Sequence, residues 1–364
     1  MDILSHFAIL EDPRSDNNTR IYSMELLVFI AISGVISGFD SWVELALFAR
    51  QKRKWIAKFV AVPERMPSHD TLGNFFRRLD AKQFASCFAQ WACALTGHQV
   101  DDLIVLDGKT LRGSHDRCAG KNALHMINVW AGHSRMILAQ HAVQGKENEI
   151  TAVAELLNML ELKGALVSMD AMGCQRAIAA KIIEKKADYL LSVKGNQPEL
   201  LEELQTTFPM AKSEQMHQQT EKDHGRIEER ICTVMPCQEK LVKGQWKNAA
   251  CYIRMQHNRE VLSENKKSKE ILYFISSRMM SPKEASENVR MRWTIENNLH
   301  WTLDVTFNED RSRIRKDNAD FNMAIIRKIA LNMLRREPTP KQSLNVKRKL
   351  AGLSDSFREV ALKI

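Results

Sequence analysis

The sequence predicts a mixed α/β sheet flanked by helices, with an all-helical segment before it and a β-rich insertion within it. Helix-length apolar patterns fill residues 1–97, and from residue 103 three apolar, strand-length segments precede alternating helices and strands. Two strand-length segments end in a lone aspartate, at Asp107 and Asp170. A carboxylate at the end of a buried strand is costly unless something neutralises it, so these aspartates indicate a site.

The N-terminal segment, residues 1–97, is expected to form a helical domain. Apolar spacing predicts helices over 24–36, 41–48, 68–79 and 84–95. The third helix begins after Ser68, a good N-cap, and carries Arg77 and Arg78 near its end. One interpretation is a basic helix that contacts DNA in helix-turn-helix fashion, and the other is a packing helix whose arginines complement the helix dipole.

The middle of the chain, residues 98–337, is expected to form an α/β domain. The predicted order is strand 103–106, strand 125–131, strand 136–143, helix 150–162, strand 165–169, helix 174–186, strand 188–193 and helix 198–208. Three successive strands followed by this alternation indicate a mixed sheet with an antiparallel first part. This is the ribonuclease-H-like order, in which the first strand is central and the fourth lies beside it. Asp107 and Asp170 are therefore expected to lie on neighbouring strands.

An insertion and two further helices complete the expected domain. Strands over 226–235, 249–256 and 269–276 define a β-rich insertion at about 213–280. Helices are expected over 284–303 and 322–336. The last segment, 338–364, is expected to be a basic tail of little order.

The charge of the chain is uneven. The 364 residues include 53 Lys and Arg and 44 Asp and Glu, which gives a net charge of +9. Residues 311–364 alone hold 14 basic and 5 acidic residues, a difference of +9, so the rest of the chain is about neutral. This excess favours a polyanionic partner, most simply DNA, and a solvated tail that aids solubility is the alternative.

The chain is expected to be intracellular and cytoplasmic, and associated with the nucleoid when it binds DNA. Its start lacks the basic and apolar regions of a signal peptide, and its longest apolar run, 26–36, is too short to cross a bilayer. Seven irregularly spaced cysteines favour free thiols in a reducing compartment. Cys232 and Cys237, with His217 and His224 nearby, leave a zinc site as an alternative.

Three acidic residues are the candidate catalytic group, namely Asp107, Asp170 and Glu296 in the predicted helix 284–303. Carboxylates at close range repel one another, and a divalent cation removes that cost. Mg²⁺ favours oxygen ligands, and two such ions can activate an attacking oxygen and stabilise a leaving oxygen in phosphoryl transfer. Asp304, eight residues after Glu296, is the reserve candidate for the third ligand.

Basic and polar residues that follow two predicted strands are candidates for DNA contact. Lys109 and Arg112 come after the first strand, and Lys194 and Asn196 come after the fifth. Ordinary turns with charged residues are the alternative for both pairs. Their position at the ends of strands of the same sheet favours the functional interpretation, because both pairs could hold phosphates near the acidic group.

The residues around Glu296 form the densest pattern in the chain. Arg292 and His300 lie one helical turn before and after Glu296, so all three are expected to share a face. Arg292 is expected to contact the scissile phosphate or to pair with Glu296. His300 is expected to contact DNA, to orient a water molecule or to satisfy a core hydrogen bond. Trp293 and Trp301 are candidates for stacking on a base or for core packing.

Together these motifs resemble those of the H-repeat-associated transposases of bacterial insertion sequences, members of the DDE superfamily with a ribonuclease-H-like core. The resemblance covers nearly the whole chain. It is carried by Asp12-Pro13-Arg14, Asp107-Gly108-Lys109-Thr110-Leu111-Arg112-Gly113, Met169-Asp170-Ala171, Lys194-Gly195-Asn196-Gln197, His224-Gly225-Arg226-Ile227-Glu228 and Arg292-Trp293-Thr294-Ile295-Glu296-Asn297-Asn298-Leu299-His300-Trp301. The wider group carries a Tyr-x2-Arg-x3-Glu-x6-Lys signature, in which Val289 and Leu303 here replace the tyrosine and the lysine.

The resemblance implies a catalytic triad of Asp107, Asp170 and Glu296 that holds two Mg²⁺ ions, with Mn²⁺ as a substitute. It implies DNA cleavage at element ends and joining of the freed 3′-hydroxyl to target DNA, without a covalent enzyme intermediate. It adds Arg226 to the candidate DNA contacts and implies a homodimer when the protein is assembled on DNA. Two alternatives stay open, namely an inactive relic that only binds DNA and a metal-dependent nuclease that does not join strands.

Overall fold

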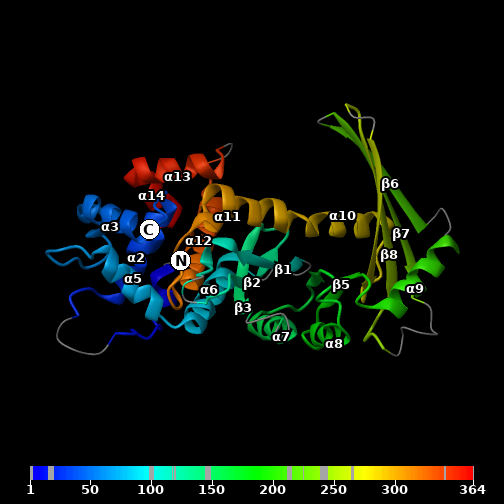
Figure 1. The fold of residues 1–364 in the computed structure, drawn as a ribbon, viewed down its shortest axis with the longest axis horizontal. Helices are drawn as coiled ribbons and strands as arrows, with labels where there is room; N and C mark the ends of the chain where they lie inside the picture. The colour runs from blue at the N-terminus through cyan, green and yellow to red at the C-terminus, as the bar shows by residue number, and fades with distance from the viewer. Residues whose placement is uncertain are drawn as a thin grey trace.

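The computed structural model contains a nine-stranded sheet in the part of the chain that it describes (Figure 1). The described residues are 3–14, 20–97, 102–116, 118, 120–143, 149–210, 215–223, 225–237, 245–263, 266–339 and 342–363. The strands are β1 Leu103–Leu111, β2 Leu124–Ala131, β3 Met136–Val143, β4 Leu166–Met169, β5 Asp188–Val193, β6 Met216–Asp223, β7 Arg226–Pro236, β8 Cys251–Val261 and β9 Lys266–Ser276. Their spatial order is β3-β2-β1-β4-β5-β9-β8-β7-β6.

The first five strands confirm the predicted ribonuclease-H-like order. β1 is antiparallel to β2, and β2 is antiparallel to β3, whereas β1, β4 and β5 run parallel to one another. Leu106 of β1 pairs with Met169 of β4. The next residues, Asp107 and Asp170, are therefore neighbours at the point where β4 ends.

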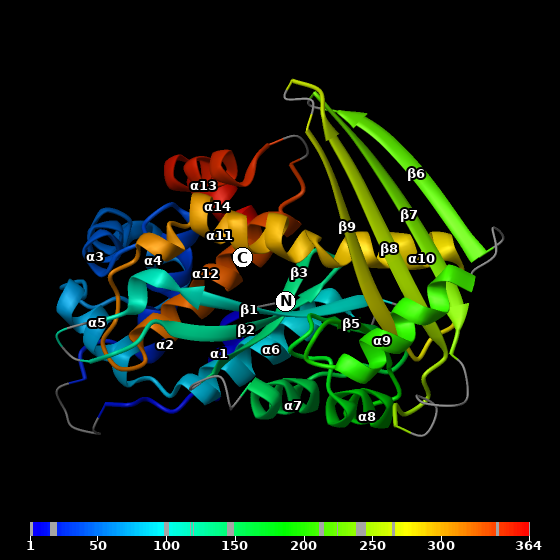
Figure 2. The same cartoon turned by 45° about the vertical axis from the view of Figure 1, so that its right-hand side comes forward.

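The predicted β-rich insertion is present and continues the same sheet. β9 is antiparallel to β5, and β8, β7 and β6 follow it outward (Figure 2). The sequence predicted β7, β8 and β9 but not β6. β6 is the outer strand and has few buried side chains on either face, so its polar sequence carries no apolar alternation that would mark it as a strand.

Helices cover both faces of the sheet. They are α1 Ile3–Phe7, α2 Met24–Ile36, α3 Trp42–Gln51, α4 Arg53–Ile56, α5 His69–Arg78, α6 Ala81–Thr96, α7 Glu149–Met159, α8 Arg176–Glu184, α9 Pro198–Thr207, α10 Pro282–Arg292, α11 Trp301–Thr306, α12 Ala319–Arg336, α13 Leu344–Leu353 and α14 Asp355–Leu362. The four helices predicted before residue 97 are present as α2, α3, α5 and α6, and Ser68 caps α5 as expected. None of the described helices is long and apolar enough to span a membrane.

Side chains alternate along β1 between two apolar cores on opposite faces of the sheet. Leu103 and Val105 belong to the core that includes α12 and the N-terminal helices. Ile104 and Leu106 belong to the core that includes α7 and α8. Asp107 and Lys109 continue the first series, so their side chains face the helical segments that follow residue 282.

The expectation of little order after residue 338 is wrong for the described residues. α13 and α14 pack against α2 and α12 and add apolar side chains to the first core. Three basic side chains of this segment, Lys347, Arg348 and Arg358, are buried. Their carboxylate partners are Glu337, Asp40 and Asp355, at 2.9, 2.6 and 2.8 Å. Part of the positive charge of the segment is therefore used inside the fold.

Candidate active site

Asp107 and Asp170 are brought together by the pairing of β1 with β4. The side chain of Asp107 is 29% exposed. One carboxylate oxygen of Asp170, Oδ1, accepts hydrogen bonds from the backbone N–H groups of Met172 and Gly173, at 3.1 and 3.3 Å. These bonds orient the Asp170 carboxylate at the end of β4. Both aspartates line a cleft of about 160 Å³ beside α7.

The pKa of Asp107 is shifted by burial and by the charged side chains around it. Burial raises this pKa, and the neighbouring charge of Asp170 raises it further, to about 6. Glu296 raises it as well, while the cationic side chain of Arg292 lowers it. Burial lowers the pKa of Arg292, and Asp170 and Asp107 act in the opposite direction. The predicted triad and Arg292 thus lie close enough to interact electrostatically, with Arg292 as the counter-charge.

Glu296 lies in an irregular part of its helix. The predicted helix 284–303 is instead three pieces, because α10 ends at Arg292, residues Ile295–His300 form a π-helical turn, and α11 begins at Trp301. Ser281 caps α10 by accepting a hydrogen bond from the backbone N–H of Glu284. π-helical turns are often found at functional sites, and this one holds Glu296 at the surface.

His300 contacts the first aspartate of the triad. Its Nδ1 lies 3.6 Å from Oδ2 of Asp107, and its side chain is 12% exposed. Burial lowers the pKa of His300, with further lowering by Lys109 and Lys328, to about 3. The imidazole is therefore neutral at pH 7, and its contact with Asp107 is not an ion pair. This burial disfavours a direct DNA contact, and Nε2 is buried without a hydrogen-bond partner among the described residues, so the expected core hydrogen bond is not observed.

The structure pairs two candidates that the sequence analysis kept apart. Lys109 Nζ lies 2.7 Å from both carboxylate oxygens of Asp304. The Lys109 side chain is 7% exposed, so as placed it does not face DNA at the surface. Asp304, the reserve candidate for the third metal ligand, is therefore paired with this lysine.

The other candidate DNA contacts are distributed over several surfaces. Arg112 is exposed beside Asp310, and Lys194 and Asn196 are exposed at the end of β5. Lys194 and Asn196 line a second cleft, and Glu149, Ile150 and Met172 line both this cleft and the aspartate cleft. The remaining three lie on other elements. Arg226 pairs with Glu228 in the insertion, Arg77 is half-buried near Asp317, and Arg78 is exposed at the end of α5.

The acidic group fits a hard divalent cation by its chemistry. Asp107, Asp170 and Glu296 offer carboxylate oxygens, and a cation would relieve the repulsion that raises the pKa of Asp107. As the side chains stand, no three His, Cys, Asp or Glu residues among the described ones form a group that could hold a metal ion. Cys232, Cys237 and His217, the described members of the zinc alternative, therefore form no such group. The fourth member, His224, lies outside the described residues.

Two features of this site were not predicted from the sequence. The first is the Lys109–Asp304 pair, for which the sequence holds one signal, since Arg292, Glu296, His300 and Asp304 recur at intervals of four residues. The second is the burial of Glu309, which is 1% exposed although its neighbours Asn308, Asp310 and Arg311 are polar or charged. Its charge acts on Arg327 and Lys328 of α12, which are also buried.

Comparison with protein families gives two matches. The family described as "Transposase DDE domain" matches residues 98–333, and the family described as "DDE_Tnp_1-associated" matches residues 4–92. The first match alone covers more than half of the chain. It includes all three acidic residues of the site.

Proteins of similar length resemble this chain from end to end. It is 35% identical over 370 residues to "Putative transposase YncI" of Escherichia coli O157:H7, covering 99% of this chain and 94% of that protein. It is 31% identical to "H repeat-associated putative transposase YhhI" of Escherichia coli strain K12, covering 98% and 96%. The cryo-EM structure of the piggyBac transposase synaptic complex with hairpin DNA matches with a TM-score of 0.50 at 13% identity, over 99% of this chain and 78% of that one. At that identity the likeness concerns the fold alone, and it supports the ribonuclease-H-like class.

Proposed function

Because this chain belongs to the DDE transposase family of insertion sequences, we propose that it cuts DNA at the ends of its element and joins the freed 3′-hydroxyl to target DNA. The observation that carries the proposal is the meeting of Asp107 and Asp170 at adjacent strand ends, with Glu296 close enough to raise the pKa of Asp107. Three neighbouring carboxylates repel one another, and a protein that only binds DNA has no need of such an arrangement.

Each acidic residue has an expected role. Asp107 is central and would bridge two Mg²⁺ ions, while Asp170 and Glu296 would each hold one of them, and Mn²⁺ is a suitable substitute. When bound, these ions supply activation of the attacking oxygen and stabilisation of the leaving oxygen. Arg292, which interacts electrostatically with both aspartates, would contact the scissile phosphate.

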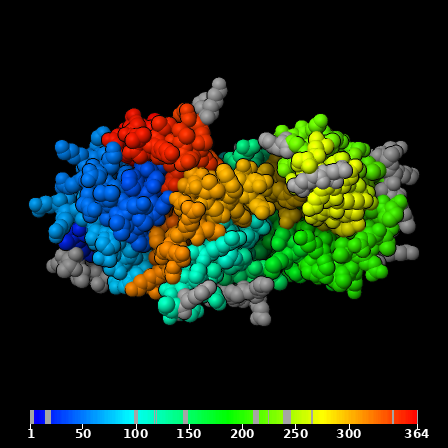
Figure 3. All heavy atoms as spheres, turned by 45° about the horizontal axis from the view of Figure 1, so that its top comes forward, coloured from blue at the N-terminus to red at the C-terminus, as the bar shows by residue number. Residues whose placement is uncertain are grey.

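The surface around Glu296 supports a DNA-binding role. Figure 3 shows the segment that carries Glu296 on the surface, between the C-terminal helices and the insertion strands. Trp301, five residues after Glu296, is 61% exposed and offers a flat face on which a base could stack. Arg112 and Lys194 are exposed cations that directly follow β1 and β5 of the sheet. Cutting two element ends together requires at least two protomers, so a homodimer on DNA is part of the proposal.

The test uses the full chain, Mg²⁺ and a labelled duplex that carries the DNA flanking the gene. The proposal predicts cleavage at the element end followed by joined products. Asp107→Asn, Asp170→Asn and Glu296→Gln should each abolish both products while DNA binding, measured without divalent cations, is retained. Undiminished cleavage by the Asp107→Asn protein would refute the assignment of the site.

Two other functions predict different products in the same assay. A metal-dependent nuclease without strand transfer would give nicks that depend on Asp107 but no joined DNA. An inactive relic would bind the duplex and leave it uncut in the presence of Mg²⁺ or Mn²⁺. Short inverted repeats on both sides of the gene would favour the active transposase over the relic.

A further inference from the structure

The segment that carries Glu296 is attached to the strand that carries Asp107 by an ion pair whose lysine is buried and whose aspartate is 31% exposed. Lys109 Nζ contacts both oxygens of Asp304 at 2.7 Å. Lys109 lies two residues after Asp107 on the same face of β1, and Asp304 lies eight residues after Glu296. The pair therefore joins two elements whose separation decides how far Glu296 is from Asp107.

The local helix geometry supports this attachment. Arg292, Glu296, His300 and Asp304 are spaced four residues apart, and each interacts with Asp107 or Lys109 of β1. A regular α-helix turns about 400° in four residues, so such a row would drift by about 40° at each step. The π-helical turn at Ile295–His300 is wider than an α-helical turn and offsets part of this drift. The interruption thus keeps the row facing β1.

We propose that Lys109 and Asp304 are positioning residues, whose ion pair fixes the Glu296 segment on β1 and so sets the geometry of the acidic triad. This inference rests on the function proposed above. The Lys109 side chain is 7% exposed and the Asp304 side chain is 31% exposed, and Lys109 Nζ contacts both Asp304 oxygens, so each of these two charges has the other as its partner. Removing either partner leaves the other charge partly buried and uncompensated, which would loosen the attachment.

The test separates positioning from folding and from DNA contact. The variants are Lys109→Met, Asp304→Asn and the exchanged pair Lys109→Asp with Asp304→Lys. Three quantities are measured, namely the single-turnover cleavage rate of end DNA, the DNA affinity without divalent cations, and Mn²⁺ affinity without DNA by electron paramagnetic resonance. Each single variant should cleave about 100-fold more slowly, as expected for a misplacement of about 1 Å. Each should bind Mn²⁺ about tenfold more weakly and DNA with unchanged affinity.

The exchanged pair restores opposite charges across the same two elements. It should recover a large part of the rate and of the Mn²⁺ affinity lost in the single variants, because the pair interacts directly. If the single variants do not fold, Lys109→Arg and Asp304→Glu replace them. These substitutions keep the charges but change the length and shape of the side chains. They should reduce the cleavage rate while the proteins stay folded.

A second ion pair in the same chain serves as the matched control. Lys121 Nζ lies 2.7 Å from Oδ2 of Asp320, whose side chain is 4% exposed, and this pair joins the segment before β2 to α12. Lys121→Met and Asp320→Asn should lower the free energy of unfolding. They should leave the cleavage rate of the folded protein and its Mn²⁺ affinity unchanged.

Four results would overturn the inference. The first is a loss of stability in Lys109→Met and Asp304→Asn without change in cleavage rate or Mn²⁺ affinity, which would make the pair merely structural. The second is weakened DNA binding in Lys109→Met alone, which would make Lys109 a DNA contact. The third is a loss of Mn²⁺ binding in Asp304→Asn alone, which would make Asp304 a ligand. The fourth is wild-type cleavage by Asp107→Asn, which would overturn the proposed function first and the inference with it.

Discussion

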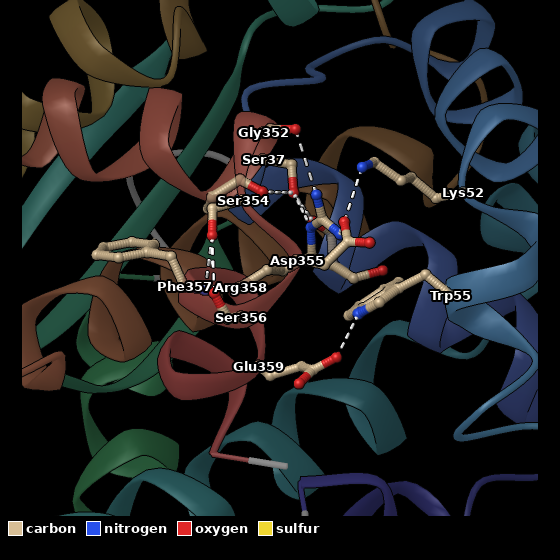
Figure 4. A network of polar contacts seen from close by, with 12 residues as sticks. Ser37, Lys52, Trp55, Gly352, Ser354, Asp355, Ser356, Phe357, Arg358 and Glu359 are labelled. Atoms are coloured by element: carbon tan, nitrogen blue, oxygen red, sulfur yellow. Dashed lines mark hydrogen bonds and ion pairs between the residues drawn. The ribbon is translucent and has the colours of Figure 1, made fainter.

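Replacement of Arg358 by alanine tests whether the basic C-terminal segment serves the fold or the DNA. Arg358 is 0% exposed in α14, and Figure 4 shows its side chain beside Ser37, which follows α2, and near Trp55 of α4 and Asp355 of α14. Its Nε donates to Ser37 Oγ at 2.9 Å and its Nη1 donates to Asp355 Oδ1 at 2.8 Å. Its guanidinium carbon lies 4.5 Å from the centre of the Trp55 ring. Burial lowers the pKa of Arg358, so these contacts offset a desolvation cost.

The expected loss of stability follows from these contacts. Each of the two hydrogen bonds contributes about 1 kcal/mol, since one partner is charged and the environment is buried. The stacking on Trp55 adds about 1 kcal/mol, and the cavity left by the long side chain adds about 1 kcal/mol more. Arg358→Ala should therefore lower the free energy of unfolding by about 4 kcal/mol, a large effect for a single substitution.

The assay is urea unfolding followed by tryptophan fluorescence, together with DNA binding at several salt concentrations. Lys349→Ala is the matched control, because Lys349 is exposed in α13, and its unfolding free energy should change by less than about 0.5 kcal/mol. The folded Arg358→Ala protein should keep the wild-type salt dependence of DNA binding, since it loses no phosphate contact. If Arg358→Ala keeps the wild-type free energy of unfolding but its DNA binding depends less on salt, the reasoning is refuted and Arg358 contacts DNA.

Three further predictions concern the site and its surroundings. Because the pKa of Asp107 is raised from 3.8 to about 6, the folded carboxyl binds its proton more readily than the unfolded one, and stability falls as the pH rises from about 4 to about 6. Without divalent cations, Asp107→Asn should therefore be more stable than wild type by up to about 3 kcal/mol at pH 7 and by little at pH 4. Added Mg²⁺ should stabilise wild type alone, and equal stability of the two proteins at pH 7 would contradict this. Gly113→Ala should cost about 3 kcal/mol in urea unfolding, because its Cβ would lie 2.2 Å from the backbone oxygen of Ser312. A neutral result would show that this close approach is absent. Arg112→Ala and Lys194→Ala should weaken DNA binding and reduce its salt dependence by about one counterion each, and an unchanged slope would remove them from the interface.

The sheet could be predicted from the sequence because its signals are local and strong. Buried strands such as 165–169 are continuous apolar runs bounded by polar turns, and their order along the chain restricts the topology to a few choices. The proximity of Asp107 and Asp170 then follows from the pairing of the first strand with the fourth. β6 could not be found this way, because an outer strand exposed on both faces needs no apolar alternation.

The parts that could not be predicted depend on tertiary partners. The segment that contains Arg358 has a basic composition that is typical of a solvated tail. The Arg358 side chain is buried only because α14 packs against the part of the fold that contains Ser37 and Trp55. Lys109 and Asp304 are 195 residues apart. The four-residue spacing from Arg292 to Asp304 places Asp304 on a shared helix face, but it does not identify Lys109 of β1 as its partner. The π-helical turn likewise depends on the contacts that the Glu296 segment makes with β1.

A structure of the protein with Mn²⁺ and element-end DNA tests the central claim most directly. The account predicts two metal peaks between Asp107, Asp170 and Glu296, with Asp107 bound to both ions and each carboxylate oxygen within about 2.0–2.6 Å of its ion. Metal peaks bound elsewhere, or an Asp107 that keeps Arg292 as its counter-charge while DNA is in place, would contradict it.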